Sequence, residues 1–164
     1  MVNKLLIIGS SLTGKTTLIK YLRDIHNMKV QEIDEELNRL NGGSFPKDMA
    51  YKNNILVPKI KKEVLNKDKI IFFTTAHYFT SEDIKIARLI GFKIIQLFVK
   101  KDELEKRNKR RMKNEGYEDH SQWFDGMLQY QKEMKDKGLV DKVVEANKPV
   151  EDVAQELIAF LQQT

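Results

Sequence analysis

The chain of 164 residues is 41% hydrophobic and 32% charged, which is typical of one folded domain and excludes a disordered chain. It has no cysteine, which excludes disulfides and thiolate-bound zinc and favours a cytoplasmic location, and no apolar run reaches the length of a membrane helix. The net charge of +5 is concentrated in residues 100–113, as expected of a site for a compact polyanion such as a nucleotide.

Apolar runs and helical spacing then predict the elements in chain order. The first half of the chain gives a strand at 2–8, a helix at 15–26, a short strand at 30–33, helical turns at 35–40, a loop at 41–46 and a helix at 49–66 that kinks or restarts at Pro58. The second half gives a strand at 69–75, a helix capped by Thr80 and ending near Gly91, a strand at 94–99, a basic helix at 102–114, a helix capped by Ser121, a strand at 139–144 and a helix after Pro149.

This alternation of strands and helices predicts an α/β fold, in which a parallel sheet is covered by helices on both faces. No internal repeat or linker divides the sequence, so residues 1–164 are expected to form a single domain.

The pattern G-x-x-x-x-G-K-[ST] occupies residues 9–16, between the first predicted strand and the first predicted helix. In this context the backbone N–H groups and the helix dipole bind phosphates, the lysine reaches the β- and γ-phosphates, and the hydroxyl binds Mg²⁺. The residues expected to bind the triphosphate are Gly9, Ser10, Ser11, Leu12, Thr13, Gly14, Lys15, Thr16 and Thr17.

The sequence lacks the signatures of two other classes of P-loop protein. Guanine-specific GTPases carry Asn-Lys-x-Asp, whereas residues 66–69 and 147–150 both lack the final aspartate. Motor-like ATPases carry an acid at the end of the third strand, where this chain has Thr75.

The whole chain resembles the small P-loop kinases, which include adenylate, shikimate and gluconate kinases. The resemblance rests on the early P-loop, the acid after the second strand, the arginine-rich helix after the fourth strand and the turn Asn147-Lys148-Pro149 before the last helix. It implies a five-stranded sheet of order 2-3-1-4-5, a short helical lid at about residues 107–120, and the use of ATP and Mg²⁺. It also implies that Asn147, Lys148 and Pro149 lie beside the adenine.

Glu32 and Asp34 are expected to lie on the same side of the second strand, at the edge where ligands bind. The related kinases carry Asp-x-Asp here, so the resemblance implies metal binding by both residues and orientation of the acceptor hydroxyl by Asp34. The alternative for Asp34 is the N-cap of the helical turns at 35–40.

The basic helix is expected to turn Leu104 toward the core, with Arg107 and Arg111 on the same side and Arg110 at its edge. Arginines at this place stabilise the charge of a transferring phosphoryl group, so Arg107 and Arg111 are candidate catalytic residues and Arg107 and Arg110 candidate nucleotide ligands. The alternative is a solvated basic face.

Candidates for acceptor binding are fewer. His77 and Tyr78 follow the third strand at the ligand-binding edge, although His77 is equally expected to make a structural hydrogen bond. Arg39 is the only arginine of the acceptor-side segment 35–66, which weakens a nucleoside monophosphate site. Trp123 and Phe124 are expected in the core.

Together these features predict an ATP- and Mg²⁺-dependent phosphotransferase that acts on a nucleotide, a nucleoside or another small metabolite. We expect a monomer or homodimer without membrane association. Two alternatives stay open, namely an adenylate-kinase-like ATPase that acts as an assembly factor with a protein partner, and a kinase of nucleic-acid ends. The balanced charge outside residues 100–113 argues against nucleic acid.

Overall fold

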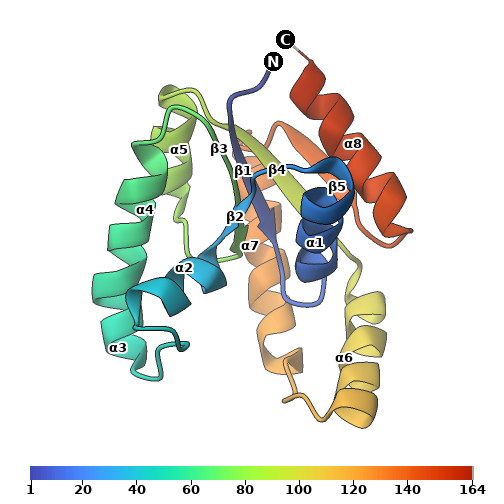
Figure 1. Cartoon of the computed structure of the whole chain (residues 1–164). Helices are drawn as coiled ribbons and strands as arrows, with labels where there is room; N and C mark the ends of the chain where they lie inside the picture. Colours follow the sequence, from blue (N-terminus) through green and yellow to red (C-terminus); the bar gives the residue numbers. More distant parts are fainter. Residues whose placement is uncertain (164) are drawn as a thin grey trace.

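A computed structural model describes residues 1–163 and shows one five-stranded sheet (Figure 1). Its strands are β1 (Lys4–Gly9), β2 (Gln31–Glu32), β3 (Ile70–Thr75), β4 (Lys93–Phe98) and β5 (Lys142–Glu145). They lie in the order β2-β3-β1-β4-β5, and every neighbouring pair is parallel. The predicted fold class and strand order are confirmed.

The central strands form the core because their side chains are apolar on both faces of the sheet. In β1, residues 5–8 are all buried, and in β3 Phe72 and Phe73 are fully buried. Leu6 is the register partner of Phe72, and Ile7 that of Phe73. Strands buried on both faces read as continuous apolar runs, which explains why the sequence located them well.

The helices are α1 (Lys15–His26), α2 (Ile33–Leu40), α3 (Met49–Tyr51), the π-helix η1 (Lys52–Leu56), α4 (Val57–Leu65), α5 (Ser81–Leu89), α6 (Lys101–Glu115), the 3₁₀ turn η2 (Ser121–Trp123), α7 (Phe124–Asp136) and α8 (Val150–Gln162). Helices α1 and α8 contact each other on one side of the sheet, and α4 and α5 lie on the other side (Figure 1). Among residues 1–163, none of these helices has both the length and the apolar character needed to cross a bilayer.

The helix predicted to change at Pro58 does so through a π-helical turn. Val57 donates its N–H to the carbonyl of Lys52, five residues earlier, and α4 then begins with Pro58 in its first turn. Proline has no N–H and is tolerated in the first turn, so the wider turn absorbs the interruption. Phe124 is buried as predicted, but the prediction for Trp123 is wrong, since Trp123 is 48% exposed and its ring meets the ring of His120 edge-on.

Candidate active site

The phosphate loop joins β1, the central strand of the sheet, to α1. Leu12 and Gly14 have positive φ angles of 66° and 88°, and Gly14 is the N-cap of α1. Within the described residues no side chain caps α1, and its first turn has no acidic residue. The first N–H groups of the helix are therefore available to an anion, and the helix dipole favours one.

Gly9 allows the loop to fold back closely on the strand. A Cβ atom at Gly9 would lie only 2.8 Å from Oγ1 of Thr13 and 3.4 Å from Cβ of Leu97, so a larger residue would displace the loop. Thr13 in turn donates its hydroxyl to the carbonyl of Ser10 at 3.0 Å. These contacts fix the curvature of the loop from within.

Lys15 lies in the loop that its own motif builds. Its Nζ donates to the carbonyls of Ser10, at 2.7 Å, and Gly9, at 3.1 Å. Burial lowers the pKa of Lys15 to about 8, while the charges of Asp34 and Glu32 act in the opposite direction. The two carboxyl groups are therefore close enough to Lys15 to favour its charged form.

Of the acidic pair only Glu32 lies in a strand, while Asp34 lies in α2, which corrects the expected local geometry. Strand β2 ends at Glu32, Glu32 is the N-cap of α2, and Asp34 lies in the first helical turn. The alternative in which Asp34 caps the helix is therefore wrong, as is the alternation argument for its direction. Burial, followed by the nearby charges of Asp34 and Glu35, raises the pKa of Glu32 to about 7.

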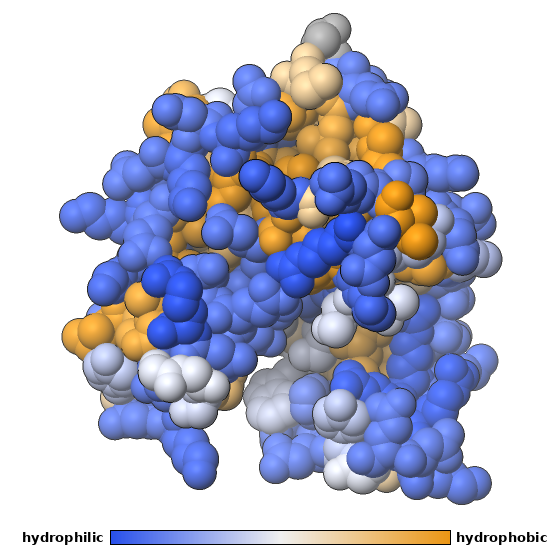
Figure 2. All heavy atoms as spheres, viewed as in Figure 1, coloured by the Kyte–Doolittle hydropathy of each residue, from blue (hydrophilic) through white to orange (hydrophobic). Residues whose placement is uncertain are grey.

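The negative charge of Asp34 also acts on the acceptor side of the site. Burial lowers the pKa of Lys52, and the charge of Asp34 offsets part of this effect. Burial, followed by the charge of Asp34, raises the pKa of Tyr78 to about 12. Asp34 thus acts electrostatically on the P-loop lysine and on a second lysine. The surface is hollowed between the α2–α3 lobe and the α6 lobe, which makes a cleft on this side of the molecule (Figure 2).

Lys52 is a feature that the sequence reasoning missed. It is only 6% exposed, and its Nζ lies 5.6 Å from the ring centre of Phe45 and 5.2 Å from that of Tyr78. Its Nζ donates to the hydroxyl of Tyr78 at 3.1 Å, and no carboxylate among residues 1–163 forms an ion pair with it. The only sequence signal was its position shortly before Pro58, where the helix was predicted to kink, because π-helical turns often occur at functional sites.

Two residues predicted to bind the acceptor, His77 and Arg39, lie in separate parts of the structure. His77 has a φ angle of 83° at the carboxyl end of β3, and its ring lies 5.2 Å from that of Tyr130 in α7. Arg39 points to its own lobe, where it forms ion pairs of 2.6 Å with Glu36 and 3.0 Å with Glu63, so that it ties α2 to α4.

Arg107 connects the basic helix to the P-loop. Its guanidinium donates to the carbonyl of Leu12 at 2.8 Å and to that of Ala146 at 3.4 Å, and it pairs with Glu103. It borders a cavity of about 180 Å³ beside the loop. Other residues around this cavity are Gly14, Thr17, Ala146, Lys148 and Val153. The cavity thus adjoins both the start of α1 and the turn at Lys148 that was predicted to lie beside the adenine.

Of the other candidates on the nucleotide side, Asn147, Pro149 and Arg110 are not among the residues around this cavity. Asn147 and Pro149 are exposed, and Pro149 precedes α8 as its N-cap, whereas Lys148 contacts Glu156. Arg110 is exposed on α6.

Arg111 belongs to the lid segment instead of the phosphate loop. It stacks on the ring of Tyr117 at 4.0 Å and lies 3.6 Å from Glu115. Buried Asn108 holds the return of this segment, because it donates to Asp119 at 2.7 Å and accepts from the N–H of His120 at 3.0 Å.

The residues present fit a nucleoside triphosphate with Mg²⁺. The uncapped amides at Gly14 and the start of α1 supply donors for phosphate oxygens, and Lys15 supplies a cation. Thr16 is exposed at the same helix start, and the carboxyl groups of Glu32 and Asp34 act electrostatically on the neighbouring Lys15. A hydroxyl and one or two carboxylates are the usual protein share of a Mg²⁺ ion that also binds phosphates.

Solved structures similar to this chain are small kinases. The shikimate kinase from Aquifex aeolicus vf5 has a TM-score of 0.72 at 18% identity, with 97% of this chain and 96% of that chain covered. The shikimate kinase from Acinetobacter baumannii, in complex with shikimate, has a TM-score of 0.75 at 15% identity, with coverages of 98% and 93%. A gluconokinase from Sinorhizobium meliloti 1021 has a TM-score of 0.62 at 12% identity, with coverages of 98% and 91%.

No protein-family model matches the sequence, and no curated protein matches it. At these low identities the likeness concerns the arrangement of the chain in space. Its near-complete coverage includes the sheet, the P-loop helix and the lid segment. The chain therefore has the fold of the shikimate kinases and gluconokinases, which are small P-loop kinases.

Proposed function

We propose that this chain is an ATP- and Mg²⁺-dependent phosphotransferase that moves the γ-phosphate of ATP to a hydroxyl group of a small, negatively charged metabolite. The observation that carries the proposal is the buried ammonium of Lys52, which forms no ion pair with a carboxylate among residues 1–163, beside a carboxylate, Asp34, that acts electrostatically on both Lys52 and Lys15. The small-kinase fold of the solved neighbours supports it.

On the donor side, the amides of the loop and Lys15 bind the phosphates of ATP. Arg107 holds the loop at Leu12 and borders the space for the nucleoside. Bound Mg²⁺ would be held by Thr16 with Asp34 or Glu32, and it supplies charge neutralisation for the phosphate oxygens. Lys15 remains mainly protonated at neutral pH with a pKa of about 8, so it stabilises the negative charge of the transferring group.

On the acceptor side, Asp34 accepts a hydrogen bond from the acceptor hydroxyl. This oxygen attacks the γ-phosphorus, the bond from phosphorus to the β,γ-bridging oxygen breaks, and ADP leaves. The proton of the hydroxyl passes to Asp34. For this role the carboxylate of Asp34 needs to be close to both the γ-phosphate and the acceptor. Its electrostatic effect on Lys15, and also on Lys52 and Tyr78, supports such a position.

Lys52 is the reason for proposing a negatively charged acceptor. A buried ammonium without a carboxylate partner is costly unless an anion reaches it. Phe45 and Tyr78 border it, so an anionic group beside apolar carbon atoms would fit there. Hydroxylated carboxylates such as shikimate, which the Acinetobacter baumannii kinase holds in its complex, have this chemistry.

The direct test is a phosphoryl-transfer screen with ATP, Mg²⁺ and pools of sugar acids and shikimate, nucleoside monophosphates, uncharged nucleosides and uncharged sugars. Formation of ADP and of a product heavier by one phosphoryl group is measured by mass spectrometry. We expect product in an anionic pool. Absence of product from every pool, with ATP hydrolysis that depends on a protein partner, would reject the proposal, and product only from uncharged pools would reject the role of Lys52.

A further inference from the structure

Two locally unfavourable residues meet at one contact beside the cleft. His77 is a non-glycine residue with a φ angle of 83°, a conformation that side chains with a Cβ rarely adopt. Gly126 lies inside the first turns of α7, where glycine is a poor helix former. A Cβ atom at Gly126 would lie 3.7 Å from Nε2 of His77. Departures from local preference that converge in this way mark functional sites more often than they mark packing.

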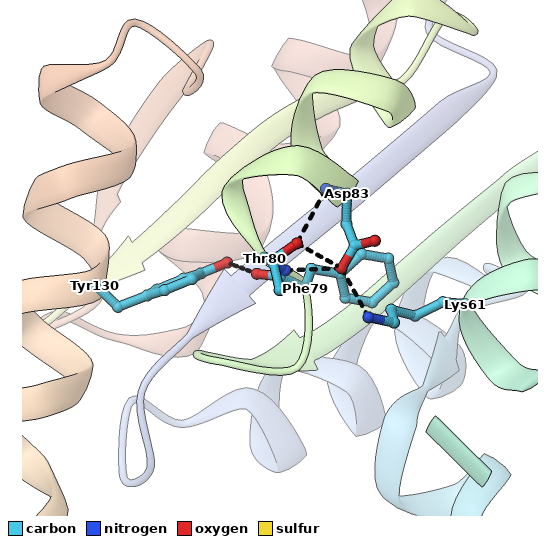
Figure 3. Close-up of polar contacts among 5 residues, drawn as sticks. All are labelled: Lys61, Phe79, Thr80, Asp83 and Tyr130. Carbon is cyan, nitrogen blue, oxygen red and sulfur yellow. Dashed lines mark hydrogen bonds and ion pairs between the residues drawn. The ribbon is translucent and has the colours of Figure 1, made fainter. Parts of the chain in front are cut away.

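The loop around His77 is fixed on both sides, which explains how it keeps this conformation (Figure 3). On one side Tyr130 of α7 donates its hydroxyl to the carbonyl of Phe79. On the other side Thr80 and Asp83 form a capping box at the start of α5, and Asp83 pairs with Lys61 of α4 at 2.7 Å. A strained conformation persists only where the surroundings determine it in this way.

The strained turn directs two successive rings to different helices. Tyr78 binds Lys52 of η1, on the acceptor-side lobe. His77 is exposed, and its ring contacts Tyr130 and approaches Gly126, both in α7. The turn therefore places His77 against α7 and Tyr78 against η1.

We propose that His77 is a specificity-determining residue whose imidazole hydrogen-bonds an oxygen of the acceptor on the α7 side of the cleft, while Gly126 leaves room for that ring. The inference rests on the proposed phosphotransferase function and deepens it. It assigns the acceptor two polar contacts, an anionic group toward Lys52 and a further oxygen toward His77, with the reacting hydroxyl at Asp34 between them.

The key variants separate the strain at His77 from its contact with the acceptor. His77→Gly adopts the positive φ angle freely, so its melting temperature should equal or exceed that of the wild type, while the KM for the acceptor should rise at least about tenfold, the loss of one hydrogen bond to a polar ligand. His77→Ala keeps the strain and should show the same rise in KM with a lower melting temperature. His77→Asn tolerates the left-handed conformation and keeps an N–H donor, so it should recover part of the affinity.

Gly126→Ala provides a second approach that leaves His77 in place. A methyl group at 3.7 Å makes an ordinary contact, so the fold should be retained, but the group reduces the space around Nε2 and should raise the acceptor KM. In all four variants the KM for ATP should stay unchanged. Wild-type acceptor KM in both His77→Gly and Gly126→Ala would overturn the proposal.

A second measurement separates this proposal from the proposed function. The ring nitrogens of His77 are followed by NMR in the ¹⁵N-histidine-labelled protein, with His77→Gly to assign the signal, during titration with the pools used in the transfer screen. A pool that shifts the signal without yielding product supports the contact and rejects the kinase. Product without any shift of the signal rejects the role of His77 alone, and no shift with no product rejects both.

Discussion

Replacing Lys52 by methionine removes a buried ammonium group from the acceptor side of the cleft and keeps a side chain of similar length. If Lys52 binds an anionic group of the acceptor, the variant loses a charge-assisted hydrogen bond, which contributes about 1.5–3 kcal/mol. Since about 1.4 kcal/mol corresponds to a factor of ten, the KM for the acceptor should rise by about 10- to 150-fold. The KM for ATP should not change, because Lys52 lies outside the phosphate loop.

The fold should tolerate this change, because opposing contributions nearly cancel. Methionine loses two cation–π contacts, each worth about 0.5–1 kcal/mol, and the hydrogen bond to Tyr78, worth about 1 kcal/mol. It also removes the unfavourable burial of a charge, which is what lowers the pKa of Lys52. The free energy of unfolding should therefore change by about 1 kcal/mol or less.

The assay compares steady-state kinetics and thermal unfolding of Lys52→Met with those of Lys59→Met. Lys59 is an exposed lysine of α4, so the control makes the same change of charge a short distance along the chain. An acceptor KM that changed equally in both variants would refute the reasoning. So would a loss of transfer that followed a loss of folded protein.

Three further outcomes are expected. Asp34→Asn should abolish phosphoryl transfer but keep ATP-induced thermal stabilisation, and full turnover in this variant would remove Asp34 from the mechanism. Chelation of Mg²⁺ should stop transfer and reduce the stabilisation by ATP, which differential scanning fluorimetry reads directly. Burial acts to raise the pKa of Asp83, but hydrogen bonds from Lys61 and Thr80 outweigh it and hold the pKa below its ordinary value of 3.8. The resulting stability is present above pH 3.8 and is lost as the pH falls through the lower pKa of the folded state. Asp83→Asn should therefore cost about 1–2 kcal/mol at pH 7, and this difference should shrink in acid, as urea unfolding can measure.

The sheet was predictable because its strands carry a strong local signal. Buried parallel strands such as β1 and β3 are uninterrupted apolar runs, and the P-loop motif fixes which strand is central. The strand order itself came from the resemblance to the small kinases. Strand β2, with only two residues, is held by its pairing with β3, and no periodicity in so short a segment reveals its end.

The acceptor side was less predictable because its geometry depends on contacts between distant segments. Lys52 has no motif of its own, and its burial depends on Phe45 and on Tyr78, which lies 26 residues away. The position of Trp123 was misjudged because a large apolar ring usually lies in the core, whereas this one meets His120 at the surface of the lid segment. Tertiary partners decided both cases.

Helix α7 touches both halves of the site with consecutive residues. The sulfur of Met127 accepts a hydrogen bond from the backbone N–H of Ser11 in the phosphate loop, with 3.5 Å between nitrogen and sulfur. The preceding residue, Gly126, faces His77. A rigid shift of this one helix would therefore alter the donor and acceptor halves together. Binding free energies linked through a shared element are reciprocal, so whatever factor ATP applies to acceptor affinity through α7, the acceptor must apply to the affinity for ATP.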